Sequence, residues 1–152
     1  MLPAGLRRAA AAAALVLLGF ALGNLFRPAA PLLPAAFVEV ERAAANGSAV
    51  LSCVTVGASH RYLAVVETPD GYTLSPVAPP PANVHATFFR HRKGMLVLST
   101  VRVVVFDVEK LPAGDFKCLA VDGGFAAAMA YADPGADWRE DVRRARAEHA
   151  EL

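Results

Sequence analysis

The feature that most constrains the fold is a run of valines that leads through a corner to the second of two cysteines. β-Branched residues favour strands, while a proline and a glycine close together end one and turn the chain. The spacing therefore predicts a strand, a tight corner and a second strand that carries Cys118. Cys53 lies far upstream of this run. The run reads Val103-x-Val105-x-x-Val108-x-x-x-Pro112-x-Gly114-x-Phe116-x-Cys118.

The two cysteines are the only ones in the chain. In a cytosolic protein they indicate unpaired thiols, and in an exported protein they indicate a single bridge. The N-terminus favours export, because Arg7 and Arg8 precede an uncharged, mostly apolar stretch that continues to Gly23. We expect a cleaved signal peptide over residues 1–23. The alternative is an uncleaved signal-anchor, since only Asn24 interrupts the apolar residues before Arg27.

The rest of the chain divides by composition. Residues 24–36 form a proline-rich spacer, residues 37–132 have the length of one β domain, and residues 133–152 form a polar tail that favours helix. Asp137 is the expected N-cap of that helix, and its few apolar residues predict a solvated or frayed element. The net charge of +1 gives no reason to expect nucleic-acid binding.

Short strands separated by turn residues are expected throughout the domain. Alternation over residues 49–56 places Ala49, Leu51 and Cys53 on one face of their strand. Turns are expected at residues 68–71 and 122–124, where Gly residues permit positive φ angles. The expected strands cover residues 37–41, 49–56, 61–67, 72–77 (a short edge strand), 115–121 and 125–131, with two further strands in residues 95–108 that are separated near Thr100.

This pattern resembles the immunoglobulin superfamily, and in particular a single variable-type domain. In that family apolar residues of one strand precede an Asp-x-Gly-x-Tyr-x-Cys corner, and Gly114 and Cys118 match two positions of that motif. Phe116 stands where the family has tyrosine and Pro112 where it has aspartate. The usual core tryptophan is also missing, since the only tryptophan lies in the tail. The chain is similar in size and layout to small exported immunoglobulin-like proteins of large DNA viruses.

The resemblance implies an all-β, immunoglobulin-like β-sandwich with one inter-sheet disulfide between Cys53 and Cys118. An N-terminal signal or anchor helix would precede it, and a short C-terminal helical tail would follow. The resemblance also implies core and corner roles for Leu51, Val103, Val105, Val108, Gly114 and Phe116.

Asn46-Gly47-Ser48 is an N-glycosylation acceptor in a eukaryotic secretory route. It falls in the loop expected before the strand that carries Cys53. In a bacterium the same tripeptide would carry no meaning.

A possible binding surface is indicated by basic and aromatic residues. Arg90, Arg92 and Lys93 belong to a basic run that suits sulfated glycans or an acidic partner, although a solvated turn between Phe89 and Met95 is the preferred interpretation. Tyr72 and Phe88 are aromatic residues of the kind enriched at protein interfaces. Either residue of the pair Phe88-Phe89 can also pack in the core, because adjacent strand residues face opposite sides.

The four histidines are scattered, and the sequence contains no metal-binding spacing, nucleophile elbow or phosphate-binding loop. We therefore expect no cofactor, no metal site and no enzymatic activity. The expected function is an exported binding module with a protein partner, such as a cell-surface protein, and with membrane contact only through an uncleaved N-terminus. The alternatives are a membrane-anchored assembly factor with its sandwich outside, a periplasmic chaperone-like β protein and, last, an enzyme.

Overall fold

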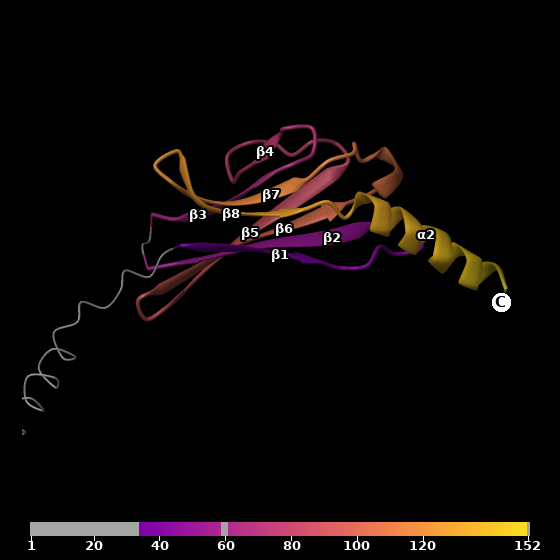
Figure 1. Ribbon diagram of the computed structural model, residues 1–152, viewed down its shortest axis with the longest axis horizontal. Coiled ribbons are helices and arrows are strands. Elements are labelled where there is room, and N and C mark those ends of the chain that lie inside the picture. The colour runs from indigo at the N-terminus through magenta and orange to yellow at the C-terminus, as the bar shows by residue number, and fades with distance from the viewer. Residues whose placement is uncertain (1–33, 59–60, 152) are drawn as a thin grey trace, which may run out of the picture. The chain divides into compact units, whose positions relative to one another are not determined.

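The computed structural model describes residues 34–58 and 61–151 (Figure 1). The expected signal or anchor segment and nearly all of the spacer before residue 34 lie outside the described residues. The described chain is mostly β, with two four-stranded antiparallel sheets. One sheet has the order β1-β2-β6-β5, with β1 Ala35–Val40, β2 Ala49–Gly57, β5 Val84–Lys93 and β6 Leu96–Val105. The other has the order β4-β3-β7-β8, with β3 Leu63–Glu67, β4 Thr73–Leu74, β7 Phe116–Asp122 and β8 Phe125–Ala132.

The central strand β2 shows why these residues form a sandwich. Its residues alternate strictly between buried and half-buried, and Leu51, Cys53 and Thr55 face inward. This alternation is the period of two that a strand with one face on the core requires. The predicted inward face of this strand is confirmed.

The hairpin formed by β5 and β6 differs from the sequence-based expectation. A break near Thr100 was expected, but β6 is one continuous strand. Thr100 lies on the outer surface, opposite Val54 on one side and Phe89 on the other. Because threonine is β-branched and outer positions accept polar groups, it continues the strand. The basic run does not form a turn, since β5 extends to Lys93 and the chain turns at Gly94, whose φ is 61°.

The predicted turns of the second sheet are confirmed. Gly71 has a φ of 81° in the turn after β3. Asp122 pairs with Phe125 across a two-residue turn in which Gly123 and Gly124 both have positive φ angles. Two consecutive positive φ angles are the requirement of the tight hairpin turn that matches strand twist, and glycine meets it without strain.

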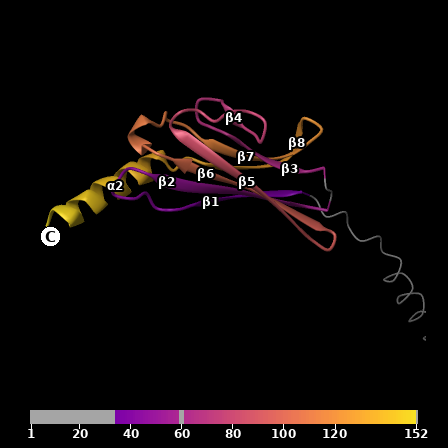
Figure 2. The same ribbon diagram turned by 180° about the vertical axis from the view of Figure 1, so that it is seen from behind.

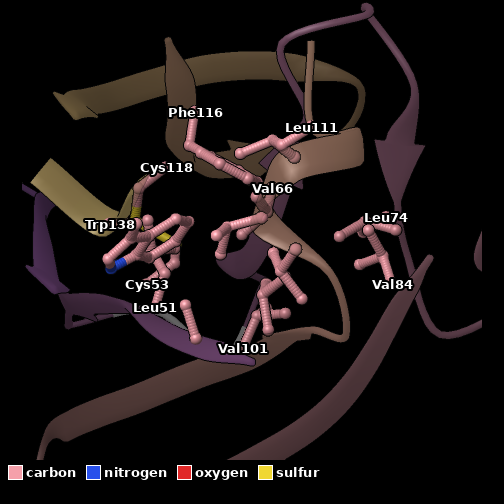
Figure 3. Packing of buried hydrophobic residues seen from close by; sticks show 14 of the residues in the cluster. Leu51, Cys53, Val66, Leu74, Val84, Val101, Leu111, Phe116, Cys118 and Trp138 are labelled. Atoms are coloured by element: carbon pink, nitrogen blue, oxygen red, sulfur yellow. A yellow bond between two sulfur atoms is a disulfide. The ribbon is translucent and has the colours of Figure 1, made fainter. Parts of the chain in front are cut away.

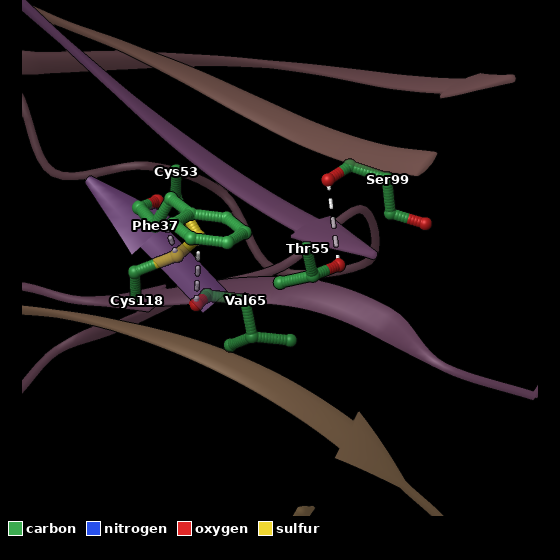
Figure 4. Close-up of a disulfide and its surroundings, with 6 residues drawn as sticks. All are labelled: Phe37, Cys53, Thr55, Val65, Ser99 and Cys118. Atoms are coloured by element: carbon green, nitrogen blue, oxygen red, sulfur yellow. Dashed lines mark hydrogen bonds between the residues drawn. A yellow bond between two sulfur atoms is a disulfide. The ribbon is translucent and has the colours of Figure 1, made fainter. Parts of the chain in front are cut away.

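A disulfide between Cys53 and Cys118 joins the two sheets, with their Cα atoms 5.3 Å apart. Figure 4 shows the bridge beside two backbone carbonyls: Cys118 Sγ lies 3.2 Å from the oxygen of Phe37, and Cys53 Sγ lies 3.8 Å from that of Val65. Bridged sulfurs carry no proton, so these are close contacts rather than hydrogen bonds. The bridge thus lies in the core, next to β1 and β3.

The corner before β7 contains a short helical turn that was not expected. Val108 was expected to end a strand, but it lies in the 3-10 helix η1 Val108–Lys110 and is fully buried there. Asp107 caps this turn by accepting a hydrogen bond from the N–H of Glu109 at 3.0 Å. Gly114 follows with a φ of 131°, and a Cβ at this position would lie 3.5 Å from Pro69, an ordinary contact. A glycine is therefore required at the corner for its backbone angle.

The C-terminal helix α2 Gly135–Ala150 packs its first half against the sandwich, whereas most residues from Arg143 onward are exposed. Trp138 and Val142, one helical turn apart, are each only 1% exposed and belong to the hydrophobic core. Figure 3 shows Trp138 at one end of that core and Leu74 and Val84 at the other. Phe116 contacts Trp138 edge to face, with ring centroids 6.0 Å apart. A tryptophan from the tail thus covers one end of the core.

The start of α2 also differs from the expectation. Pro134, not Asp137, precedes the helix, and it makes no side-chain capping bond. Proline suits this position because it has no N–H that would need a partner. Asp137 lies in the first turn, where a carboxylate complements the positive end of the helix. Figures 1 and 2 place α2 at one end of the sandwich and the β5–β6 hairpin at the other.

Candidate functional site

The outer surface of β3, β7 and β8 carries neighbouring apolar side chains. The strand pairing brings its side chains into cross-strand rows: Val65 lies opposite Leu119, which lies opposite Met129. A parallel row joins Leu63 to Val121. We call this surface the apolar face; it consists of Leu63, Val65, Leu119, Val121, Met129 and Tyr131.

Solvent reaches much of the apolar face. Leu63 is 44% exposed, Met129 48% and Tyr131 56%, while Val65 and Leu119 between them are half-buried. Soluble proteins rarely leave a contiguous apolar patch of this kind uncovered unless it binds something. The sequence contains part of this signal, because β3 and β7 carry apolar residues at both alternations, but only the strand pairing joins these residues and Met129 into one face.

An ion pair closes one edge of the apolar face. Lys117 lies opposite both Glu67 and Tyr131, and its ammonium group bonds to the Glu67 carboxylate. This hydrogen bond, together with the negative charge of Glu67, raises the pKa of Lys117 above its usual value, and Tyr131 and Asp115 act in the same direction. The ammonium group of Lys117 is therefore charged at neutral pH, and the ion pair forms a polar rim to the patch.

A further exposed aromatic side chain lies at the tip of the β7–β8 hairpin. Phe125 follows the turn between β7 and β8 and is 81% exposed. It therefore buries little surface within the domain. Phe125 pairs with Asp122, next to Val121, so strand alternation places it on the side of the hairpin opposite to the apolar face.

The outer surface of the other sheet also carries apolar side chains, since Val56 lies opposite Leu98 in the row next to Val54 and Thr100. Its exposed aromatics, Phe37 and Phe89, lie on the two edge strands, with Val54 and Thr100 between them. An ion pair between Arg102 and Glu41, at 3.5 Å, and further polar residues interrupt the surface.

The aromatic residues singled out in the sequence do not form the exposed surface. Phe88 is partly buried against the core, and Phe89 is the exposed member of the pair. Phe88 also lines a hollow of about 150 Å³, together with Leu63 and Arg90. Tyr72 packs partly against the core near the turn after β3, and its hydroxyl donates a hydrogen bond to the carbonyl of Pro79.

The basic residues of the predicted surface lie on a different element. Arg90, Arg92 and Lys93 are all exposed at the end of β5, in the sheet that does not contain the apolar face. Tyr72 lies in the connection between β3 and β4 of the other sheet. The predicted binding residues therefore do not make one surface.

Asn46 lies exposed in the turn before β2. Its Oδ1 accepts hydrogen bonds from the backbone N–H of Ser48 at 2.9 Å and from the Ser48 hydroxyl at 2.7 Å. Gly47 between them has a φ of 87°. The acceptor asparagine and the hydroxyl of its tripeptide are thus in contact at the surface.

Within residues 34–58 and 61–151, no group of three or more His, Cys, Asp or Glu side chains is placed so that it could hold a metal ion. The only charged residue around the hollow beside Phe88 is Arg90, so that hollow contains no acid–base pair. The same ranges contain no helix whose length and hydropathy would allow it to cross a membrane.

No protein-family model matches the sequence, and no curated protein matches it.

Proposed function

We propose that this chain is an exported, immunoglobulin-like module that binds another protein through its apolar face. The partner is a protein of the cell surface with a complementary apolar patch. Recognition needs no cofactor and involves no chemical step.

The strand order supports the immunoglobulin-like part of this proposal. Four strands in the order β1-β2-β6-β5 pack against a sheet with β3, β7 and β8, and the bridge connects β2 to β7. Immunoglobulin domains have four strands in one sheet and at least three in the other, with a bridge between their second and sixth strands. Here β4 adds a short strand beside β3, as happens in variable-type domains.

The single observation that carries the binding function is the exposure of the apolar face. Its side chains combine aliphatic groups, a methionine and a tyrosine, which is the composition of interface centres. Methionine is flexible and polarisable, so Met129 can adapt to a partner surface. The Glu67–Lys117 pair at the edge supplies the polar rim that surrounds such a centre.

The face also lies on a rigid support. β7 is paired on both sides, and Cys118 on its inner surface is bridged to the other sheet. Binding therefore requires little ordering of the backbone, and less of the interaction free energy is lost to entropy.

The test is binding of the full chain, secreted from eukaryotic cells and labelled, to a panel of intact cell types. The decisive variant is Met129→Glu, which places a charge on the apolar face beside Leu119, on the edge strand β8. Burial of an unpaired charge at an interface weakens binding by roughly thirtyfold or more. The matched control is Phe37→Glu, which adds the same charge to an equally exposed residue of the other sheet.

We expect Met129→Glu to lose cell binding and Phe37→Glu to retain it. The cells are first treated with glycosaminoglycan-degrading enzymes, so that binding to sulfated chains does not contribute, and protease should then remove the remaining binding. Equal loss in both variants, or no binding to any cell type, would overturn the proposal. A stable dimer in which Met129→Glu alone releases monomers would overturn it too, because a second copy would then be the occupant.

A further inference from the structure

The β5–β6 hairpin projects from the sandwich and carries a concentration of positive charge. Arg90, His91, Arg92 and Lys93 are the last four residues of β5, and every residue from Phe89 to Met95 is exposed. Figures 1 and 2 show this hairpin extending past the neighbouring strands. We call these four residues the basic hairpin.

The charge is segregated along the chain. Residues 34–152 contain twelve of the fifteen Lys and Arg residues and all fourteen acidic residues, so this part of the chain is slightly negative overall. None of the acidic residues lies in residues 71–106, which include all of β4, β5 and β6. The basic hairpin is therefore a local positive region on a domain whose net charge has the opposite sign.

Two of these cations are not neutralised by the protein. Arg92 Nε donates a hydrogen bond to the backbone carbonyl of Gly94 at 3.1 Å, inside the hairpin itself. In the part of the chain that the structure describes, neither Arg92 nor Lys93 forms an ion pair. Most exposed arginines of α2 differ in this respect: Arg143 and Arg144, for example, both contact Glu140.

The geometry of β5 suits a linear ligand. β5 is an edge strand, paired only with β6, so part of its backbone N–H groups face solvent. Alternation places Arg90 and Arg92 on one side of the strand and His91 and Lys93 on the other. Ten residues of strand extend over about 33 Å. An extended anion that follows this edge can contact the cations on both sides of the strand.

We propose that β5 and the basic hairpin form a binding site for a sulfated polysaccharide. Sulfate groups spaced along a linear chain match cations distributed on the two sides of a narrow ribbon. A lipid surface is flat and requires cations that project in one direction, which these do not. The site lies in the other sheet from the apolar face, and the two surfaces approach each other where Leu63 and Arg90 line the same hollow.

A simpler role for these charges is protection of the edge strand. Charged side chains, lysine in particular, prevent an exposed strand from pairing with another copy. That role requires no ligand. It predicts that removal of the charges causes dimers or aggregates and leaves affinity for polyanions unchanged.

The test is chromatography of the full secreted chain on immobilised heparin, with salt titration. The variant is Arg92→Gln combined with Lys93→Gln. The matched control is Arg143→Gln combined with Arg144→Gln, which gives the same net charge from two exposed arginines at the other end of the molecule. Circular dichroism and the mass before and after reduction show whether each variant is folded and bridged.

We expect the hairpin variant to bind heparin roughly tenfold more weakly and to lose about two ionic contacts in the salt dependence of the affinity. The control should bind as the unmodified chain does. An equal decrease in both variants would show an effect of net charge alone and overturn the proposal. Equal or tighter binding of the unmodified chain to single-stranded nucleic acid or to phosphatidylserine vesicles would overturn the assignment to a sulfated chain.

Discussion

The indole Nε1 of Trp138 donates a hydrogen bond to the backbone carbonyl of Glu41 at 2.7 Å, across 97 positions of the chain. The bond connects α2 to the end of β1, while the indole itself contacts Phe116 at the start of β7. Arg139 adds a bond to the carbonyl of Leu111 at 2.7 Å. The helix therefore holds both sheets at one end of the sandwich and is part of the same folding unit.

Substitution of Trp138 should destabilise the whole domain and not only the helix. We expect Trp138→Ala to cost about 3–5 kcal/mol of unfolding free energy, because it leaves a cavity and an unpaired carbonyl. Trp138→Phe keeps most of the ring volume but loses the donor, and should cost about 1–2 kcal/mol. Guanidinium unfolding followed by circular dichroism measures both.

The unmodified chain offers a direct check of this coupling, since Trp138 is its only tryptophan. Its fluorescence should change in the same transition as the β-sheet signal. A fluorescence transition at clearly lower denaturant would show that α2 detaches while the sandwich remains folded. An exposed position of the helix, Arg144→Ala, serves as the control and should change stability by less than about 0.5 kcal/mol.

Removal of the disulfide should lower the unfolding free energy by an amount comparable to that expected for Trp138→Ala. The cysteines are 65 positions apart, and closure of a loop of that length removes chain entropy worth about 4 kcal/mol from the unfolded state. We expect the double variant Cys53→Ala, Cys118→Ala to lose about 2–5 kcal/mol. The measurement is unfolding of the oxidised, the reduced and the double-variant protein. A double variant as stable as the oxidised protein would contradict the prediction.

Asp107 should make stability depend on acid pH. The pKa of the Asp107 carboxyl lies below the usual 3.8, mainly because the carboxylate accepts a hydrogen bond from the backbone N–H of Glu109. The charges of Lys110 and Arg146 also lower this pKa. A lowered folded-state pKa stabilises the protein above the unfolded value, and this contribution is lost as the pH falls through the folded value. Asp107→Asn keeps a capping group without the charge.

We therefore expect Asp107→Asn to be less stable than the unmodified chain at pH 7. The difference should shrink as the pH falls below 3.8 and vanish when the aspartate is protonated in both states. Urea unfolding at several pH values between 2 and 7 measures it. A difference that stays constant over this range would show that the charge of Asp107 does not stabilise η1.

Local rules explain which elements could be predicted from the sequence. The inward face of β2 follows from its alternation, and the turn after β7 follows from Gly123 and Gly124, because both features depend only on neighbouring residues. The expected break at Thr100 was wrong. The sequence alone does not distinguish a polar residue on the outer surface of a strand from a residue in a turn, because the distinction depends on which strands pair with it. Gly94, two residues beyond Arg92, was the better turn signal.

Features that depend on distant contacts could not be predicted in the same way. Trp138 and Val142 are two apolar residues one helical turn apart, and in the sequence they do not make a strong apolar stripe. They are nevertheless enough to attach the helix, because both are buried at the open end of the sandwich. The apolar face required the pairing of β3, β7 and β8. In the sequence, Leu119 and Met129 belong to separate apolar runs, and only the register places them side by side.

Asn46 provides the last prediction, which concerns modification during export. In the described structure its side chain is exposed, and its Oδ1 contacts the Ser48 hydroxyl, while its amide nitrogen donates no hydrogen bond. A glycan on that nitrogen would therefore displace no protein contact. The full chain secreted from eukaryotic cells should decrease in mass on treatment with an asparagine-linked glycosidase. Asn46→Gln and Ser48→Ala should each abolish this decrease, because the transfer requires both the asparagine and the hydroxyl. Ser48→Thr is the matched control and should retain the glycan. A secreted chain whose mass the glycosidase leaves unchanged would show that the tripeptide is not used.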